Sequence, residues 1–235
     1  MLDVPGRTPS AVGALDRMFG ALPAKELLET TCRDLFPGRV ALVSSFGADS
    51  VALLHMMASV DPSVPVLFLD TGKHFGETTA YRRELADTLG LTNVIDLVPA
   101  PEDLAAEDPD GTLNETNPDA CCAVRKVRPL YKALAGYDAW ITGRRRDQTF
   151  SRQAMHVFEA DGARTKINPL AGWTQDDIDT YIWRFELKRH PLVDEGYASI
   201  GCAPCTARTA AGENARAGRW QGRDKTECGI HFSSN

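Results

Sequence analysis

A doubly wound, mostly parallel α/β sheet is the fold that this sequence predicts. The predicted strands are four short, continuous runs rich in Val, Ile or Leu, at residues 40–43, 64–69, 94–98 and 139–142. Helical patterns lie between them, near residues 49–59, 75–90 and 121–135. Continuous apolar runs are typical of parallel strands that are buried on both faces. Repetition of strand, helix and strand then indicates a sheet with helices on both sides.

The remaining patterns predict one helix before the sheet, and a hairpin and a helix after its parallel part. Residues 23–36 carry apolar side chains at helical spacing. Residues 153–158 and 164–168 can pair as a hairpin. Thr174 is suited to cap a helix that runs to about Phe185, because its hydroxyl can accept a hydrogen bond from a free backbone N–H.

The composition is that of a soluble globular protein, and 235 residues suffice for one domain with a full core. The net charge of -6 argues against a non-specific nucleic-acid binder, which needs a basic excess. Residues 99–120 hold seven acids and no Lys or Arg, whereas residues 142–152 hold four arginines and one acid. The acidic stretch is long and unpatterned, so we expect a surface excursion there.

The sequence also predicts where the protein works. No apolar run approaches membrane-spanning length, and the first twenty residues lack the basic and apolar blocks of a signal peptide. We therefore expect a cytoplasmic protein. In that reducing compartment, six cysteines indicate metal binding or catalysis more than disulfides.

A loop containing Ser and Gly follows the first predicted strand and leads into a helix that begins near Asp49. Backbone N–H groups at a helix start can cradle an anion, with help from the hydroxyls of Ser45 and Ser50 and from the small Gly47. The loop has no lysine, so it is not the nucleotide P-loop with Gly-Lys-Ser/Thr. The alternative is a tight turn with Ser50 exposed, and the loop alone does not decide between the two.

Two further segments lie where a parallel sheet binds ligands, at the carboxyl ends of strands. Residues 69–74 follow the second strand, and residues 142–148 follow the fourth. The latter segment contains Arg144, Arg145 and Arg146, whose guanidinium groups can hold a polyanion through paired hydrogen bonds. Singly, such a run is more often a solvated basic loop. Together with the Ser/Gly loop it favours an anion site.

Four cysteines form two close pairs, Cys121-Cys122 and Cys202-Ala-Pro-Cys205. Zinc sites usually take both pairs from Cys-x-x-Cys spacing, whereas iron–sulfur clusters tolerate many spacings of four thiolates. The residues therefore favour a cluster slightly over zinc. Buried, unligated thiols are the third interpretation. From residue 201 onward Gly, Ala, Arg and Cys dominate, and we expect a functional tail packed on the domain.

Cys228 stands apart from these pairs, in a basic segment that also contains His231. Cationic neighbours lower the pKa of a thiol and make it a better nucleophile at neutral pH. A bystander cysteine more often has apolar surroundings, as does Cys32 on the apolar stripe of the first predicted helix. Cys228 is therefore the thiol that we expect to be reactive.

Taken together, these residues resemble the assimilatory adenylyl-sulfate (APS) reductases, of the same family as the phosphoadenylyl-sulfate (PAPS) reductases. The resemblance runs from about residue 40 to residue 231. Its most specific pieces are the two cysteine pairs and the Lys-Thr-Glu-Cys-Gly-Ile-His segment around Cys228. The Ser-Ser-Phe-Gly-x-x-Ser loop also resembles the wider group of adenine nucleotide alpha hydrolases. The resemblance implies a nucleotide-binding domain of that type over residues 1–211 and a C-terminal catalytic tail over residues 212–235.

The resemblance implies a two-stage reaction and an iron–sulfur cofactor. Cys228 would attack the sulfur of adenosine 5′-phosphosulfate, displacing AMP and leaving a cysteine S-sulfonate. Reduced thioredoxin or glutaredoxin would then attack the sulfur of Cys228, and sulfite would be released. In this family the 4Fe-4S cluster does not pass electrons to the substrate. It is expected to organise or polarise the site, with Lys126 as the link.

Residue by residue, the resemblance gives three sets of site residues. The expected cluster ligands are Cys121, Cys122, Cys202 and Cys205. The residues expected to act in catalysis are Cys228, Lys126, His231, Arg219 and Arg223. The residues expected to bind the substrate are Ser44, Ser45, Gly47, Ser50, Asp70, Lys73, Gly143, Arg144, Arg145 and Gln148. Which cation contacts the sulfate stays open.

Several alternatives remain at this point. The runner-up substrate is PAPS, either alone or beside APS, since the surplus of arginines does not exclude a pocket for the extra phosphate. An adenylating or ATP-hydrolysing relative would keep the fold without needing Cys228. A redox sensor with a cluster or zinc would bind a nucleotide without turnover. We expect neither nucleic acid nor membrane as a partner, and the sequence leaves a homo-oligomer open.

Overall fold

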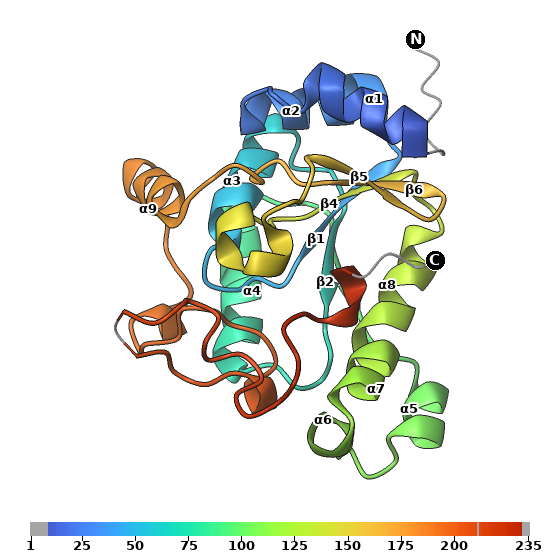
Figure 1. Ribbon diagram of the computed structural model, residues 1–235, viewed down its shortest axis with the longest axis vertical. Coiled ribbons are helices and arrows are strands. Elements are labelled where there is room, and N and C mark those ends of the chain that lie inside the picture. The colour runs from blue at the N-terminus through green and yellow to red at the C-terminus, as the bar shows by residue number, and fades with distance from the viewer. Residues whose placement is uncertain (1–8, 211, 232–235) are drawn as a thin grey trace.

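The computed structural model describes residues 9–210 and 212–231 (Figure 1). Residues 1–8, 211 and 232–235 lie outside the described part. The expectation about the first residues of the chain and the predicted domain boundary at residue 211 therefore fall outside it. In the described part, no helix is long and apolar enough to cross a membrane.

The described residues form a six-stranded sheet with the order β3-β2-β1-β4-β6-β5. β1 pairs in parallel with β2 and β4, β2 with β3, and β4 with β6, whereas β5 and β6 are antiparallel. The predicted mostly parallel sheet is confirmed. A hairpin follows as predicted, but its first strand is Phe158–Asp161 and not residues 153–158. The strand bounds are β1 Val40–Ser44, β2 Val66–Leu69, β3 Val94–Leu97, β4 Ala139–Ile141, β5 Phe158–Asp161 and β6 Arg164–Ile167.

Helices cover both faces of the sheet, with α3 and α4 on one side and α8 on the other (Figure 1). Successive side chains of a strand point to opposite faces. Val40 and Leu42 accordingly join the apolar cluster beneath α3 and α4, while Ala41 and Val43 join the cluster beneath α8. Burial on both faces is the physical reason for the continuous apolar runs in the sequence.

The helices α2, α3, α4, α8 and α9 agree with the predicted patterns, whereas α1 lies where no helix was predicted. Both α2 and α7 continue as π-helical turns, at Thr31–Leu35 and Ala123–Val127. Thr174 caps α9 as predicted, because its Oγ1 accepts from the N–H of Asp177 at 3.2 Å. The helix bounds are α1 Pro9–Phe19, α2 Ala24–Thr30, α3 Ser50–Val60, α4 Gly76–Thr88, α5 Pro101–Glu107, α6 Leu113–Thr116, α7 Pro118–Cys122, α8 Arg128–Leu134 and α9 Gln175–Arg184.

The acidic stretch at residues 99–120 differs from the prediction, since it forms the short helices α5, α6 and α7. Asp108 in this stretch is buried and accepts from Nε and Nη2 of Arg125 at 3.0 and 2.6 Å. Nη1 of Arg125 donates to the carbonyl oxygen of Thr71 at 2.9 Å. Polar contacts with the helix after the cysteine pair hold the stretch in place, and apolar periodicity carries no signal of such contacts.

Cys121 and Cys122 lie at the end of α7, just before the π-turn that leads into α8. In that turn the N–H of Arg128 donates to the carbonyl of Ala123, five residues back. Single π-turns inside helices occur frequently at functional sites. The helical segment also begins earlier than predicted, at Pro118, with the Asn117 side chain accepting from the N–H of Ala120 at 3.1 Å.

Candidate active site

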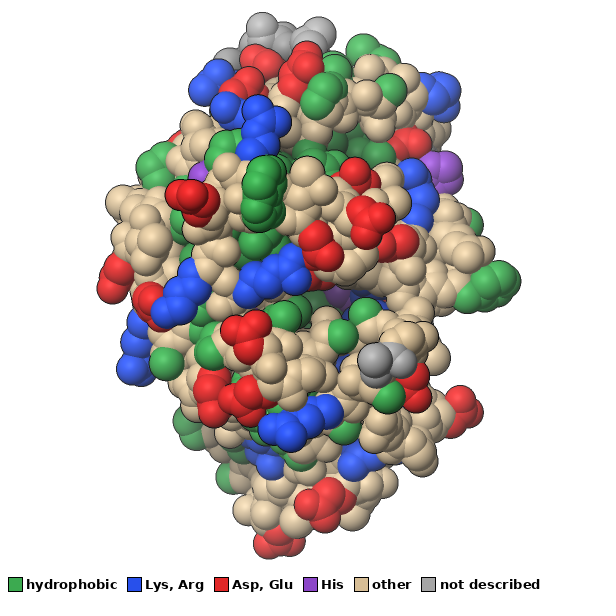
Figure 2. All heavy atoms as spheres, turned by 90° about the vertical axis from the view of Figure 1, so that its left-hand side faces the viewer, with side chains coloured by type: hydrophobic (Ala, Val, Ile, Leu, Met, Phe, Trp, Pro, Cys, Tyr) green, Lys and Arg blue, Asp and Glu red, His purple; other side chains and the backbone are tan. Residues whose placement is uncertain are grey.

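A cavity of about 400 Å³ lies at the carboxyl ends of β1 and β4. Its walls are the Ser/Gly loop after β1, the arginine segment after β4 and parts of the segment 198–231. In the space-filling view, Lys and Arg side chains lie along a hollow that crosses one side of the molecule (Figure 2). Parallel α/β sheets bind their ligands at this edge. The fold therefore brings together three segments that are far apart in the sequence.

The Ser/Gly loop is fixed by its own hydroxyls. Oγ of Ser44 accepts from the N–H of Phe46 at 3.1 Å, and Oγ of Ser50 accepts from the N–H of Gly47 at 2.9 Å. Phe46 is fully buried and has a φ of 47°, an uncommon conformation for a residue with a side chain. A Cβ at Gly47 would lie 3.0 Å from the carbonyl oxygen of Ile200. All four predicted loop residues line the cavity, namely Ser44, Ser45, Gly47 and Ser50.

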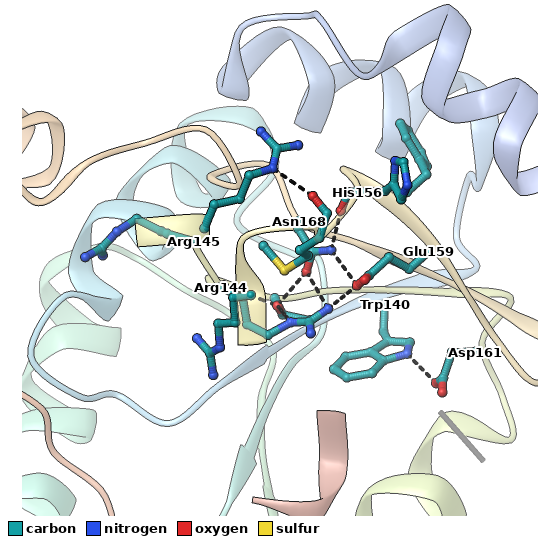
Figure 3. Close-up of polar contacts among 12 residues, drawn as sticks. Trp140, Arg144, Arg145, His156, Glu159, Asp161 and Asn168 are labelled. Carbon is teal, nitrogen blue, oxygen red and sulfur yellow. Dashed lines mark hydrogen bonds and ion pairs between the residues drawn. The ribbon is translucent and has the colours of Figure 1, made fainter. Parts of the chain in front are cut away.

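Arg144 lines the cavity, but its guanidinium group has partners within the protein. It contacts Glu159 in an ion pair and donates from Nη2 to Oδ1 of Asn168 at 3.1 Å. Asn168 in turn donates from Nδ2 to Glu159 at 2.9 Å. Figure 3 shows Arg144 pointing toward this pair, with Arg145 pointing away from them. Arg144 thus fastens the end of β4 to β5 and to the residue after β6.

Arg145 has its own set of partners on the other side of the same segment. It donates to Asp49 Oδ2 at 2.9 Å, to Asp147 Oδ1 at 3.0 Å and to Gln175 Oε1 at 2.7 Å. The side chain of Gln148 accepts from the N–H of Arg145 at 3.1 Å. Arg145, Gln148 and the adjacent Gly143 line the cavity as predicted, and contact of any of them with a substrate stays a prediction.

Asp70 and Lys73, predicted after the second strand, do not line this cavity. Asp70 is held by the turn itself, where its Oδ1 accepts from the N–H of Gly72 at 3.0 Å. Nζ of Lys73 donates to the carbonyl of Gly111 at 2.7 Å and lies beside a second, smaller cavity. Their predicted role in substrate binding has no support from this geometry.

The smaller cavity is lined by all four cysteines of the two pairs, Cys121, Cys122, Cys202 and Cys205. Oγ1 of Thr71 lies 3.2 Å from Sγ of Cys202. Four soft thiol donors at one buried cavity fit an iron–sulfur cluster better than hard cations, which prefer oxygen. In the described residues, however, no group of three or more His, Cys, Asp or Glu side chains is arranged to hold a metal ion. The donor set fits a cluster, and the cluster itself stays a prediction.

Lys126 lies between the two cavities and lines both. Burial alone would lower the pKa of this amine, but the nearby thiols of Cys202, Cys228 and Cys122 in their charged form raise it. The raised pKa keeps Lys126 positively charged at neutral pH. A partly buried cation thus lies between the cysteine pairs and the main cavity, and its role as a link stays a prediction.

Cys228 is half-buried and lines the main cavity, where it packs against the apolar cluster that includes Trp140 and Ile230. Two cations that are close to Cys228 in the sequence point away from the cavity. Arg223 donates to the carbonyl of Asn114 and does not line the cavity, and Lys225 pairs with Asp119. A catalytic role of Arg223 therefore has no support from its position. The cations that share the cavity with Cys228 are Lys126, Arg144, Arg145, Arg152, Arg216 and Arg219.

Several buried polar atoms of this cavity have no hydrogen-bond partner. In the described residues eight buried side-chain nitrogen or oxygen atoms lack one, and four of these belong to cavity residues: His74, Arg216, Arg219 and His231. Nε2 of His74 binds the Leu69 carbonyl at 2.7 Å, so its Nδ1 is an acceptor. The Nε groups of Arg216 and Arg219 can only donate. Buried donors without partners are costly, so they indicate a site that a ligand with acceptors completes.

His231 is the fourth of these residues, and its ring stacks near Trp140 with centroids 6.3 Å apart. Burial, together with the positive charges of Arg144 and Arg152, holds its pKa well below the ordinary value of histidine. The ring is therefore neutral at pH 7. With Nδ1 unpartnered, it can donate one hydrogen bond into the cavity in the appropriate tautomer.

Sequence reasoning missed some residues of this site. Arg216 lies three residues before Arg219 but was not singled out, because nothing in the charge pattern separates it from other surface arginines. His74, Arg152 and Glu227 were also missed, since each gains its place only through contacts across the fold. A buried, unpartnered donor is the signal that identifies Arg216, and it exists only in three dimensions.

A parallel sheet with a Ser/Gly loop and a basic cavity at its carboxyl edge defines an α/β protein of the adenine nucleotide alpha hydrolase type. Yeast FAD synthetase in complex with FAD shares this fold, with a TM-score of 0.57 at 16% identity over 84% of this chain and 68% of that chain. At this identity the likeness shows the fold alone.

The chain belongs to the family of the phosphoadenosine phosphosulfate reductase domain, whose model matches residues 39–208. A protein of Mesorhizobium japonicum named adenosine 5′-phosphosulfate reductase is 53% identical over 219 residues, 93% of this chain and 86% of its own. The crystal structure of PAPS reductase from Candida auris, a phosphate complex, has a TM-score of 0.69 at 27% identity and covers 85% of this chain and 98% of that chain. The resemblance found in the motifs is confirmed.

Proposed function

We propose that the protein is an adenylyl-sulfate reductase, which converts adenosine 5′-phosphosulfate to sulfite and AMP in assimilatory sulfate reduction and cysteine biosynthesis. The observation that carries this proposal is the set of unpartnered donors around a half-buried thiol. Arg216, Arg219 and His231 line one cavity with Cys228, and each has a buried nitrogen without a partner. A phosphosulfate group has the oxygen acceptors that these donors lack.

In the first stage, the thiolate of Cys228 attacks the sulfur of the substrate. A new S–S bond forms, the bond from that sulfur to the bridging oxygen breaks, and AMP leaves with the electron pair. AMP is a good leaving group, so the protein chiefly aligns the thiolate, gathers positive charge and excludes water. Lys126, Arg216 and Arg219 supply the charge, and neutral His231 supplies a hydrogen-bond donor.

In the second stage, a thiolate of reduced thioredoxin or glutaredoxin attacks Sγ of Cys228. Sulfite leaves, a mixed disulfide forms, and the second thiol of the partner resolves it, so the dithiol supplies the two electrons. The partner must reach a thiol that was shielded in the first stage. We therefore propose that residues 212–235 act as a tail over the domain of residues 1–211, closing over the substrate and then reopening.

We further propose that Cys121, Cys122, Cys202 and Cys205 hold a 4Fe-4S cluster. When bound, the cluster would supply negative charge beside Lys126 and so fix and polarise the side of the cavity where the phosphosulfate binds. The support is the donor set, four thiols at one buried cavity with Lys126 shared between it and the main cavity. Iron and sulfide analysis of anaerobically purified protein tests this proposal. Cys122→Ser should lose iron, sulfide and visible absorbance, and stoichiometric zinc in the wild type would contradict it.

The decisive experiment is mass spectrometry of the protein incubated with APS in the absence of reductant. We expect a sulfonate adduct on Cys228, which reduced thioredoxin discharges. Cys228→Ser should bind APS and form no adduct. Absence of an adduct in the wild type with any adenylyl sulfate would favour an adenylating enzyme or a sensor. A cytoplasmic location, with neither nucleic acid nor membrane as partner, completes the proposal.

PAPS is the second candidate substrate. The basic cavity supports it, because PAPS carries a 3′-phosphate in addition to the groups of APS. Arg144, Arg145 and Arg152 lie on the wall next to the Ser/Gly loop, where a 3′-phosphate could meet positive charge. The Candida auris relative is itself named a PAPS reductase. The three guanidinium groups are already paired with acids, which favours APS. Comparable rates of adduct formation with the two nucleotides would contradict that preference.

A further inference from the structure

Glu227, the residue before Cys228, is a buried carboxylate whose partners come from other segments. Its exposure is 6%. Nε and Nη2 of Arg152 donate to its two oxygens at 2.6 and 2.7 Å, and Nη2 of Arg216 lies 3.4 Å from Oε2. A guanidinium that holds a carboxylate at two points fixes its orientation as well as its distance. The position of Glu227, and with it the backbone of Cys228, is thus tied to Arg152.

Arg152 is in turn held to the wall of the cavity. It donates from Nη1 to Oε1 of Gln148, which also accepts from the N–H of Arg145. Arg145 reaches Asp49, at the start of α3 next to the Ser/Gly loop, at 2.9 Å. Asp49, Arg145, Gln148, Arg152 and Glu227 all line the same cavity. A continuous chain of polar contacts therefore runs along one wall from the loop to the residue before the thiol.

Two other polar contacts attach the segment 220–231 to the acidic helices, since Arg223 donates to the carbonyl of Asn114 and Lys225 pairs with Asp119. Its buried apolar side chains, within the described residues, are Trp220 and Ile230, and Asp224 is exposed to solvent. Segments with few buried apolar contacts open at low free-energy cost. The two-point contact of Glu227 joins the residue next to Cys228 to the wall of the cavity that follows β4.

We propose that Glu227 and Arg152 form a latch that holds the segment 220–231 closed and positions Cys228 in the cavity. Both are positioning residues, because they act on the thiol through the backbone and the cavity wall. The inference deepens the proposed function and rests on it for the meaning of closure. A closed latch suits the attack of Cys228 on substrate, and an open latch gives a dithiol partner access to the sulfur.

Alkylation of Cys228 by iodoacetamide, without substrate, measures opening independently of the reaction. Glu227→Gln and Arg152→Met remove opposite charges from the surroundings of the thiol. A purely electrostatic effect would speed alkylation in the first variant and slow it in the second. Loss of a latch speeds both, by at least about fivefold if the contact is worth an ordinary charged hydrogen bond. Asp224→Asn, in the same segment, is the matched control and should alkylate at the wild-type rate.

Opposite directions in the two variants, or no change in either, would overturn the latch. Amide hydrogen exchange over residues 220–231 gives the same comparison without chemistry at the thiol, and exchange in β1 and β2 reports whether each variant is folded. The double variant with Glu227→Arg and Arg152→Glu should restore part of the protection, whereas a defect unrelated to this pair would persist in it.

Single-turnover adduct formation connects the latch to the proposed reaction. Both single variants should form the Cys228 adduct with APS at least about tenfold more slowly. Discharge of the adduct by reduced thioredoxin should be no slower than in the wild type. If the wild type forms no adduct, the proposed function fails while the alkylation result stands. If the wild type reacts and both stages slow equally in the variants, the latch fails while the proposed function stands.

Discussion

The two basic walls of the cavity differ in what their charges do. After β4, Arg144 and Arg145 are fully engaged with Glu159, Asn168, Asp49 and neighbouring side chains. Across the cavity, Arg219 has a buried Nε without a partner, and its guanidinium packs over Gly201 so closely that a Cβ there would lie 2.2 Å from it. Both walls are rich in arginine. The guanidinium groups after β4 have partners within the protein, whereas Nε of Arg219 has no hydrogen-bond acceptor.

The difference teaches that a basic cluster in a sequence does not identify a binding site. A guanidinium group that is paired with a carboxylate contributes to rigidity, and its removal leaves a charge unpaired. A buried guanidinium nitrogen without a partner lowers the stability of the folded chain, so we expect its removal to weaken binding of a ligand more than it weakens the fold. Loss of stability and loss of reactivity should therefore separate between the two walls.

The largest effect is expected for Arg219→Met, on the unpaired wall. Removal of one donor that stabilises developing charge typically lowers the rate about 10²–10³-fold. We expect a fall of that order in the rate of adduct formation on Cys228, measured in single turnover with APS. The urea midpoint should fall little, because Nε has no hydrogen-bond partner and the contact that is lost is the packing of the guanidinium group over the Trp220 ring, 4.5 Å from its centroid. A fall in stability with an unchanged rate would reverse the comparison.

Arg144→Met, on the paired wall, should give the opposite pattern. It leaves Glu159 and Asn168 without their guanidinium partner, and because Glu159 is partly exposed we expect a loss of about 2 kcal/mol in the free energy of unfolding. Urea denaturation measures this loss. Arg144→Lys keeps the charge without the forked geometry and should be intermediate. An undiminished stability with abolished substrate binding would place Arg144 among the ligand-binding residues.

Two histidines, one buried and one partly buried, show the same difference between paired and unpaired groups. His190 uses both nitrogens, with Leu192 N–H donating to Nδ1 at 3.2 Å and Nε2 lying 2.9 Å from Oγ1 of Thr78, whereas Nδ1 of His231 has no partner. Burial lowers the pKa of His190 from 6.5 to about 4. Between pH 6.5 and about 4, His190 is therefore protonated in the unfolded chain and neutral in the folded chain. The stability that this histidine contributes is complete above pH 6.5 and is lost as the pH falls toward 4.

This loss is on the order of 2 kcal/mol. His190→Gln should be less stable at pH 7, because it changes the contacts with Thr78 and Leu192, but its free energy of unfolding should fall less steeply between pH 6.5 and 4. Denaturation series at several pH values measure the two slopes. Parallel slopes in the variant and the wild type would show that His190 does not titrate as its burial requires.

The smallest effect is expected outside both walls, at Arg128. Its side chain is exposed and pairs with Asp103 and Glu107 on the surface of α5. Exposed ion pairs contribute little and are screened by salt. Arg128→Gln should leave the melting temperature and the rate of adduct formation unchanged within the precision of the measurements. A clear loss of stability would show that surface pairs matter here more than the comparison assumes.

Much of the fold was predictable because its signals are local. Continuous Val-, Ile- and Leu-rich runs report burial on both faces of a parallel sheet, and Thr174 reports its helix cap through a single hydroxyl. The acidic helices were missed because their attachment is an ion pair between Asp108 and Arg125. That contact joins residues 17 positions apart and leaves no periodic trace.

The candidate site was predictable where chemistry is tied to residue type. Paired cysteines indicate a metal or cluster site, and a Ser/Gly loop after a strand indicates an anion site, whatever the rest of the sequence. Both sets line cavities in the structure. The role of each arginine was not predictable, since it depends on which carboxylate lies beside it after folding. Arg223 shows the consequence, because it is four residues from Arg219 in the sequence and yet turns to the carbonyl of Asn114.

The order of the segments along the chain has a consequence for biosynthesis. β6 ends at Ile167, so the ribosome makes every strand of the described sheet before it makes Cys228, 61 residues later. At about 5–20 residues per second, that interval lasts roughly 3–12 s. The sheet and the Ser/Gly loop after β1 therefore have time to form before Cys228, the proposed nucleophile, is made. Cys228 is thus made after the sheet, together with the last residues of the segment 198–231 that complete the wall of the cavity.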